Sequence, residues 1–130
     1  MAEAIDTNVV VRIITADDPD QTARADALLT TTVCLVVPTV LLETGWVLRS
    51  QYELSNENAA RRLRAFVQIP NVLVEDPQAV HQALDDAEAG MDLADAFHRA
   101  FAGGADRMRT FDEPFVRAAS GRPGVPVEAL

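Results

Sequence analysis

The sequence predicts an α/β fold, a three-layer α/β/α sandwich with a mainly parallel central sheet. Short apolar runs rich in β-branched residues alternate along the chain with longer segments of helical periodicity. The helical segments are long enough to cross over a sheet, and such crossovers connect parallel strands. The 130 residues match the usual length of one domain, so we expect a single domain over residues 1–130.

Six elements are expected in the first half of the chain. Apolar residues recur at the spacing of one helix face over residues 9–14, and Pro19 suits the first turn of a second helix. The continuous apolar run Val33–Val37 is typical of a strand covered on both faces. Thr39 and Ser55 are expected to cap two further helices. The expected elements are thus a strand over 2–5, helices over 9–14 and 19–29, a strand over 33–37, and helices that follow Thr39 and Ser55.

The second half is expected to hold three strands and three helices. Asp76 and Pro77 combine a capping acid with a proline that suits a first helical turn. Gly90 ends the helix that follows, and Gly103 and Gly104 come after the next one. The expected elements are a strand over 71–74, helices over 77–90 and 92–101, a strand over 108–110, a helix over 114–119 and an edge strand over 125–129.

The charged residues exclude several enzyme classes. The chain has 11 basic and 20 acidic residues, a net charge of −9, and every basic residue is arginine. The absence of lysine rules out a Walker A phosphate loop, Schiff-base chemistry and phosphotransfer domains that need a lysine. We expect the run Arg61, Arg62 and Arg64 to be either a solvated helix face or an RNA contact, and Asp85, Asp86 and Glu88 to be solvated surface.

The cysteine content and the apolar segments bear on the cellular setting. Cys34 is the only cysteine and lies in an apolar run, so we expect it to be a buried strand residue in a reducing, cytoplasmic protein. The longest apolar region is interrupted by Thr30–Thr32, Pro38 and Glu43. Neither a signal peptide nor a membrane span therefore fits this sequence.

Acidic residues follow two of the predicted strands. Asp6 comes directly after the first strand, and Asp112 comes just beyond the strand that ends at Thr110. In open parallel sheets, ligands bind beyond the carboxyl ends of the strands. We therefore expect both carboxylates to emerge at one edge of one sheet.

Three more acids lie on predicted helices. Glu43 is the only charged residue from Val33 through Leu48, and it projects near Trp46 on a stripe expected to face protein. A buried carboxylate there would require a positive partner. Asp92 and Asp95 are three residues apart, so they share one helix face near its N-terminus.

Taken singly, three of these acids have a structural explanation: Asp6 as a turn residue, Asp92 as a helix cap, and Asp112 as the capping acid ahead of Pro114. Taken together, the carboxylates lack any accompanying cysteine cluster or HExxH helix. Oxygen ligands of this kind suit Mg²⁺ or Mn²⁺ and make zinc a poor candidate.

Four segments resemble the signature blocks of the PIN-domain family, in particular its bacterial VapC-type toxin ribonucleases. They occur in the order of the family's blocks and span most of the chain. The segments are Ile5–Arg12, Leu42–Thr44 with Trp46–Leu48, Asp92–Phe97, and Thr110–Asp112 with Phe115.

The resemblance implies a Mg²⁺- or Mn²⁺-dependent endoribonuclease that hydrolyses phosphodiester bonds with a metal-activated water, leaving a 5′-phosphate and a 3′-hydroxyl. It also implies a toxin of a toxin–antitoxin pair, a homodimer, and a cognate antitoxin whose tail lies across the active-site groove. By the same resemblance, the catalytic and metal-binding acids are Asp6, Glu43, Asp95 and Asp112, with Asp92 a further metal ligand and with Asn8 and Thr110 orienting the carboxylates.

Two alternatives belong to other classes of protein. A catalytically inactive PIN fold would serve as a protein-interaction module, with the apolar stretch Val33–Leu48 as its interface. An aspartate-nucleophile phosphatase would use Asp6, but such enzymes need a second acid two residues on, where this chain has Asn8, and a lysine.

Several other residues that can bind ligands are expected to be structural. We assign no role to His81 or His98, although His98 lies one turn after Asp95. Trp46 and Phe97 are able to stack on a base, but core packing is the expectation for both.

Overall fold

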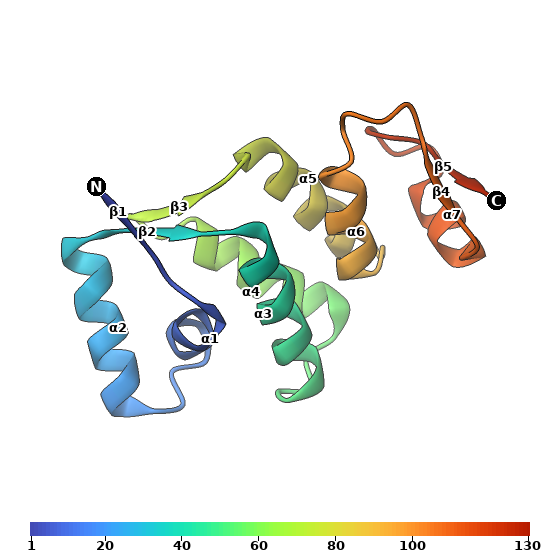
Figure 1. Ribbon diagram of the computed structural model, residues 1–130. Coiled ribbons are helices and arrows are strands. Elements are labelled where there is room, and N and C mark those ends of the chain that lie inside the picture. The colour runs from blue at the N-terminus through green and yellow to red at the C-terminus, as the bar shows by residue number, and fades with distance from the viewer.

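Five short strands and seven helices alternate along residues 1–130, all of which the computed structural model describes (Figure 1). The α/β class and the parallel direction of the strands are confirmed. No helix is long and apolar enough to cross a membrane. The elements are β1 (Ala2–Ala4), α1 (Thr7–Thr15), α2 (Pro19–Thr31), β2 (Val33–Val36), α3 (Pro38–Ser50), α4 (Asn56–Val67), β3 (Val72–Val74), α5 (Pro77–Glu88), α6 (Leu93–Ala100), β4 (Met108–Thr110), α7 (Glu113–Ala119) and β5 (Val127–Ala129).

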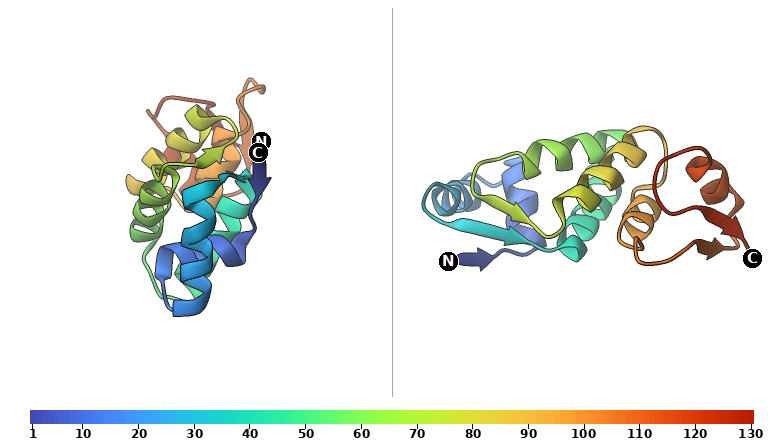
Figure 2. Two further views of the ribbon diagram at one scale, coloured as in Figure 1. Left: turned by 90° about the vertical axis from the view of Figure 1, so that its left-hand side faces the viewer. Right: turned by 90° about the horizontal axis from the view of Figure 1, so that it is seen from above.

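The strands form two sheets, whereas the sequence predicted one. The first sheet has the order β1-β2-β3, and the second pairs β4 with β5. Glu3 is the register partner of Cys34 in the first sheet, and Arg109 is the partner of Glu128 in the second. The two sheets lie toward opposite ends of an elongated molecule, with α5 and α6 between them (Figure 2).

Helices cover one face of the three-stranded sheet. In Figure 1, α1, α2, α3 and α4 all lie on the same side of the strands. The burial of β2 alternates accordingly, because Cys34 and Val36 are buried whereas Val33 is exposed. On the neighbouring strand, Leu73 is 47% exposed. The prediction that Val33–Val37 is covered on both faces is therefore wrong, and we call the uncovered side the bare face of the sheet.

Side chains also explain where the helices begin. Asp18, Ser55 and Asp76 each accept a hydrogen bond from a backbone N–H in the first turn of α2, α4 and α5, respectively. Thr39 was predicted to cap α3, but this helix begins at Pro38 with no side-chain cap. Proline lacks an N–H, so its position in the first turn leaves one fewer donor to satisfy.

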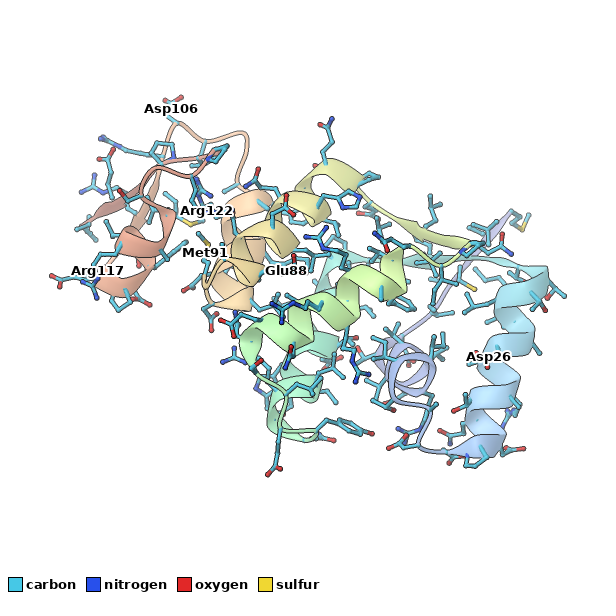
Figure 3. All side chains as sticks on the ribbon, turned by 180° about the vertical axis from the view of Figure 1, so that it is seen from behind. Asp26, Glu88, Met91, Asp106, Arg117 and Arg122 are labelled. Atoms are coloured by element: carbon cyan, nitrogen blue, oxygen red, sulfur yellow. The ribbon has the colours of Figure 1, made fainter.

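The segment β4–α7–β5, residues 108–129, forms the C-terminal unit, and a buried ion-pair network joins it to α5 and α6. Asp86 of α5 is fully buried and accepts from Arg99 of α6 at 2.9 Å and from Arg122 at 2.5 Å. Arg99 also donates to the carbonyl oxygens of Val125 and Arg122, at 2.7 and 2.9 Å. Figure 3 shows Arg122 reaching toward these helices. The prediction that Asp86 is solvated surface is wrong, because two guanidinium groups compensate its charge.

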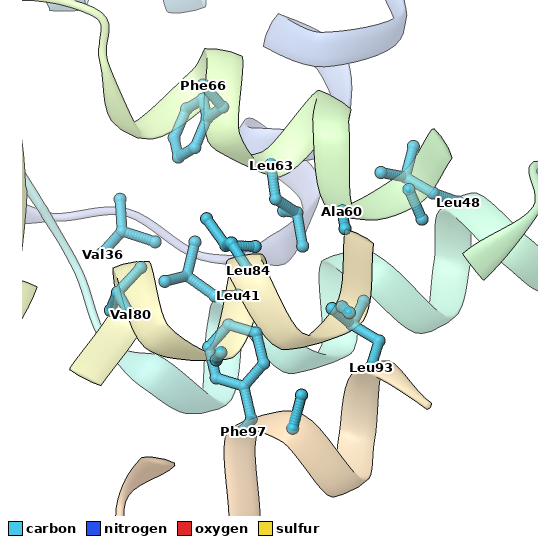
Figure 4. Packing of buried hydrophobic residues seen from close by; sticks show 14 of the residues in the cluster. Val36, Leu41, Leu48, Ala60, Leu63, Phe66, Val80, Leu84, Leu93 and Phe97 are labelled. Atoms are coloured by element: carbon cyan, nitrogen blue, oxygen red, sulfur yellow. The ribbon is translucent and has the colours of Figure 1, made fainter. Parts of the chain in front are cut away.

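The main core lies between the helices and the three-stranded sheet, where a cluster of 22 buried apolar residues packs together (Figure 4). Leu41 and Leu48 of α3 and Leu63 of α4 belong to this cluster. Helix α3 approaches α6 at Gly45, where an added Cβ would lie 2.2 Å from Leu93 Cδ2. Any side chain at position 45 would therefore displace Leu93.

Candidate active site

The N-terminal acids are Asp6, which follows β1, and Glu43, which lies on the helix that follows β2. Asp6 follows β1 and caps α1, accepting from the N–H of Val9 at 3.4 Å. Glu43 lies on α3 and accepts a hydrogen bond from the Thr7 hydroxyl. Because Thr7 is the neighbour of Asp6 and is itself buried, this bond ties the two acid-bearing helices together.

Glu43 is exposed, which corrects the prediction that it faces protein and needs a positive partner. The helix turns its apolar residues Leu41 and Leu48 into the core and leaves Glu43 and Trp46 outside. An exposed carboxylate is solvated by water, so Glu43 needs no cation, and the Thr7 hydroxyl donates one hydrogen bond to it.

The C-terminal acids are Asp92, Asp95 and Asp112. The first two lie at the start of α6, which fixes their positions. Asp92 caps α6, accepting from the N–H groups of Ala94 at 2.9 Å and Asp95 at 3.2 Å. Asn56 of α4 fixes the same turn, since its side chain donates to the Met91 carbonyl at 2.7 Å and accepts from the Leu93 N–H at 2.8 Å. The carboxylates of this turn are therefore held in place from two sides.

Asp112 caps the next helix, α7, by accepting from the Phe115 N–H at 3.1 Å. The Thr110 hydroxyl accepts from the backbone N–H of Asp112 at 2.9 Å. Thr110 thus positions Asp112 through its backbone, whereas the sequence predicted a bond to a carboxylate.

Asp95 is the carboxyl group in this site whose pKa is altered. Its half-buried position raises the pKa above the usual aspartate value, and the charges of Asp92 and Asp112 raise it further. The nearby His98 acts in the opposite direction. Asp95 therefore lies within electrostatic range of both other C-terminal acids.

Arginines neutralise only one of the five predicted acids. Arg49 of α3 contacts Asp92 at 3.1 Å. The other four acids have no salt-bridge partner. Among these four acids, Asp95 is the one whose raised pKa records repulsion from neighbouring carboxylates.

The five acids offer only oxygen donors, which are the ligands that Mg²⁺ and Mn²⁺ take. No group of three or more carboxylate, imidazole or thiol side chains lies close enough to hold one ion. As placed within one chain, these residues therefore do not fit a three-carboxylate metal centre. The prediction that Asp6 and Asp112 emerge at one edge of one sheet is also not met, because β1 and β4 belong to different sheets.

Asn8 was predicted to orient a carboxylate, but its side chain lines a hollow of about 310 Å³ between α1 and α2. Thr7, Arg49 and Asn56 make the contacts to the acid-bearing turns instead. Sequence analysis missed these three residues because each acts on a partner more than 30 positions away. Only the position of Thr7 directly after Asp6 offered a signal.

Other predicted residues divide between the surface and the core. Phe97 is buried as expected, whereas Trp46 is 63% exposed, so the expectation of core packing is wrong for Trp46. Trp46 and Arg49 line a hollow of about 420 Å³ on α3, next to Asp92. Arg64 pairs with Asp85 and Glu88, which gives it a structural role.

Acid-capped helices that follow parallel strands define the class of this protein as an α/β protein with an acidic site. The model of the family described as PIN domain matches residues 4–121, and the chain therefore belongs to the PIN domain family. The chain is also similar to the crystal structure of VapBC2 from Rickettsia felis bound to a DNA fragment from their promoter. That similarity has 14% identity, a TM-score of 0.41, and coverage of 99% of this chain and 98% of the other. No curated protein matches the chain.

Proposed function

We propose that this protein is an endoribonuclease that hydrolyses RNA phosphodiester bonds at a site formed by Asp6, Glu43, Asp95 and Asp112, with Asp92 beside them. Membership of the PIN domain family and the match of all four acid-bearing segments to that family's signature blocks support this proposal. The observation that carries it is the placement of Asp95 between Asp92 and Asp112, because such crowding of like charges is typical of a functional site.

Asp95 is the residue best suited to take a proton in the reaction. A carboxylate whose pKa is raised is a stronger base than an ordinary aspartate, so it accepts a proton from an attacking water more readily. The Arg49 guanidinium, next to Asp92, is available to contact a substrate phosphate. Both groups lie at the start of α6 or beside it, which places acid and cation together.

We further propose Mg²⁺ or Mn²⁺ as the cofactor. Four unpaired carboxylates repel a phosphodiester, so RNA binding at neutral pH needs added positive charge. Thermal melts test this directly, because an ion that binds the folded state raises the melting temperature. We expect Mg²⁺ or Mn²⁺ to raise the melting temperature of the wild type, and Asp95→Asn to remove that shift. An unchanged metal response in Asp95→Asn would contradict the assignment.

RNA cleavage tests the activity. We expect the wild-type protein with Mg²⁺ or Mn²⁺ to cut a structured RNA, leaving 5′-phosphate and 3′-hydroxyl ends, and EDTA to stop the reaction. Glu43→Gln and Asp95→Asn should each lower the rate by at least about 100-fold, as expected for removal of a group that acts on the transition state.

Asp26→Asn serves as the matched control. Asp26 is an exposed carboxylate of α2, far from the C-terminal unit, so the same change of charge should leave cleavage unaltered (Figure 3). Equal cleavage by wild type and Glu43→Gln would show that the activity belongs to another site or to a contaminant.

We also propose that the protein is the toxin of a toxin–antitoxin pair, acting as a cytoplasmic homodimer silenced by a cognate antitoxin. This rests on the resemblance of its four segments to VapC-type toxins and on its single cysteine. Induced expression should arrest growth, and Glu43→Gln should not. Normal growth despite RNA cleavage in vitro would reject the toxin role and leave the nuclease proposal standing.

A second candidate is a catalytically inactive interaction module of the same fold. The observation that favours it is the absence of any three-residue metal-binding group within the chain. Such a module would show neither RNA cleavage nor a metal-induced rise in melting temperature, although it would fold normally.

A further inference from the structure

Four strands have one edge without a partner, β1 and β3 in the first sheet and β4 and β5 in the second. β1 pairs only with β2, and all three of its residues are exposed. β4 pairs only with β5. The unpaired N–H and C=O groups of an edge strand are a template for pairing with another strand.

The C-terminal unit cannot bring β4 to β1 of its own chain without breaking buried contacts. Arg99 and Asp86, which are 1% and 0% exposed at their side chains, hold the unit to α6 and α5. The open edges of β1 and β4 lie toward opposite ends of the molecule in Figure 2. A second copy of the chain can supply the missing strand while the Asp86 ion-pair network of each copy stays intact.

The backbone directions of the two edges match. The Ile5 N–H bonds to Leu35 of β2, so the alternating residues Ala2 and Ala4 direct their backbone groups to the open edge. Met108 and Thr110 bond to the β5 side, so Arg109 faces the open edge of β4. A parallel ladder requires this offset, in which a residue that bonds across the pair is the register partner of one that does not. The backbone groups of Ala4 face the open edge of β1, and those of Thr110 face β5, so Ala4 can be the register partner of Thr110.

Charge selects this register over its neighbours. With Ala4 opposite Thr110, Glu3 is opposite Arg109, and both residues are exposed in the single chain. Opposite charges at such cross-strand positions are favourable, and a shift by two residues would lose the pair. Asp6 and Asp112 each follow their strand by two residues, so the same register brings these acids side by side.

The faces of the two sheets also agree. α7 packs on the face of the second sheet that carries Met108 and Val127, because Val127 is buried whereas Arg109 and Glu128 are exposed. In this register, Met108 lies on the same side as Ala2 and Val33, which is the bare face. Right-handed crossovers require the same placement. In the joined sheet, the chain goes from β1 to β2 and β3 in one direction and from β4 to β5 in the other. The helices of the two halves must therefore lie on opposite faces of the sheet.

We propose that two copies of this chain exchange their C-terminal units, so that β1 of each pairs in parallel with β4 of the other. The joined sheet then has the order β3-β2-β1-β4-β5, with its last two strands from the second copy. Each copy gives and receives one unit, so the contact is two-fold and closed. Asp112 from one copy lies beside Asp6 from the other, and the acid site is incomplete without both.

A disulfide tests the pairing. In a Cys34→Ala background, one tagged chain carries Glu3→Cys and an untagged chain carries Arg109→Cys; the two are refolded together and oxidised. Register partners on adjacent strands lie about 4.8 Å apart, within the range that a disulfide spans. We expect a covalent dimer that contains one chain of each kind, and a dimer mass for the wild type in solution.

The control replaces Arg109→Cys by Glu128→Cys, which lies on β5, one strand further from β1. No cross-link should form with Glu3→Cys in that mixture. Three results would overturn the proposal: a monomeric wild type, a dimer without the Glu3→Cys to Arg109→Cys link, or an internal disulfide in a single chain that carries both cysteines. The last result would show that β4 closes on its own β1.

Complementation gives a second readout, which rests on the proposed nuclease activity as the cross-link does not. Asp6→Asn and Asp112→Asn chains should each be inactive alone. Refolded together in equal amounts, they should recover about a quarter of wild-type cleavage, because half of the dimers are mixed and one of their two sites is intact. No recovery despite a cross-linked dimer would show that the exchange is real and that the two acids do not share a catalytic site.

Discussion

The N-terminal region and the C-terminal unit of this protein are held in place by different forces. Most of the 22 residues of the apolar cluster come from the region before β4, and the C-terminal unit contributes only Phe115, Ala119 and Val127. Its orientation relative to α5 and α6 is instead set by the network that Asp86 makes with Arg99 and Arg122. Apolar packing is non-directional, whereas a buried guanidinium–carboxylate network requires one geometry.

A small unit with few apolar residues can therefore still be oriented uniquely. Gly124, with φ of +116°, lets the β5 side approach the Arg99 guanidinium so closely that an added Cβ would lie 3.3 Å from Nη2. Buried charges of this kind are costly to leave unpaired, so they oppose other orientations of the unit more strongly than they stabilise this one.

The largest expected effect comes from breaking the network on one side. Asp86→Ala leaves Arg99 buried without its carboxylate and should lower the free energy of unfolding by about 3–5 kcal/mol. Urea unfolding measures this loss, and hydrogen exchange should show that β4 and β5 lose protection before β2 does.

Asp85→Ala is the matched control for that change. Asp85 is the neighbouring exposed acid, which pairs with Arg64 at the surface, so its removal should cost less than about 1 kcal/mol. If the two variants were equally stable, the C-terminal unit would be held by apolar packing like the rest of the chain.

A smaller effect is expected where the N-terminal region meets α6. Gly45→Ala places a methyl group against Leu93 in a buried contact and should destabilise the protein by about 1–3 kcal/mol, despite the higher helix propensity of alanine. The double variant with Leu93→Ala should lose less than the sum of the two single losses. Gly103→Ala, where an added Cβ meets nothing within 4 Å, is the control. If the losses of stability in the two single variants were additive, residues 45 and 93 would not interact.

The smallest expected change in stability comes from removing the charge of Asp95. Because the folded-state pKa of Asp95 lies above its unfolded value, the folded protein binds this proton more tightly, and the ionised group lowers stability at neutral pH. That loss disappears as the pH falls through the folded-state pKa. Asp95→Asn should therefore raise the free energy of unfolding at pH 7, by less than about 1 kcal/mol because the group is half-buried and screened. The gain should shrink toward pH 4.

Asp26→Asn should show no such gain, since Asp26 is fully separate from the C-terminal acids and exposed. A loss of stability in Asp95→Asn at pH 7 would indicate that the helix dipole at the start of α6 outweighs the repulsion.

Local signals predicted most of the elements and several of their ends. Asp6 and Asp112 were recognised because they follow predicted strands, and Asp92 because it lies at the start of a predicted helix; each of the three caps a helix. These predictions succeeded because strands, helices and caps depend on residues within a few positions of one another. The proposed joining of all four acids into one site was not tested by such signals, and remains the subject of the cross-linking and cleavage experiments.

The predicted Thr39 cap was a local error, but the errors about Asp86 and Trp46 involve partners distant in the chain. Asp86 looked like surface because Arg122, 36 positions away, gives no local sign of reaching it. Trp46 looked buried because its neighbours on α3 are apolar, yet α6 covers the side of Gly45 and leaves Trp46 outside.

The sequence by itself determined that this is an α/β protein of the PIN domain family, and it determined which carboxylates follow strands or begin helices. The tertiary structure decided which strands share a sheet, which acid is buried with two arginines, and which acids lie close enough to affect one another. The physical reason is range: hydrogen-bond caps and periodic apolar faces are set between near neighbours, whereas sheet order and charge pairing depend on how distant segments pack.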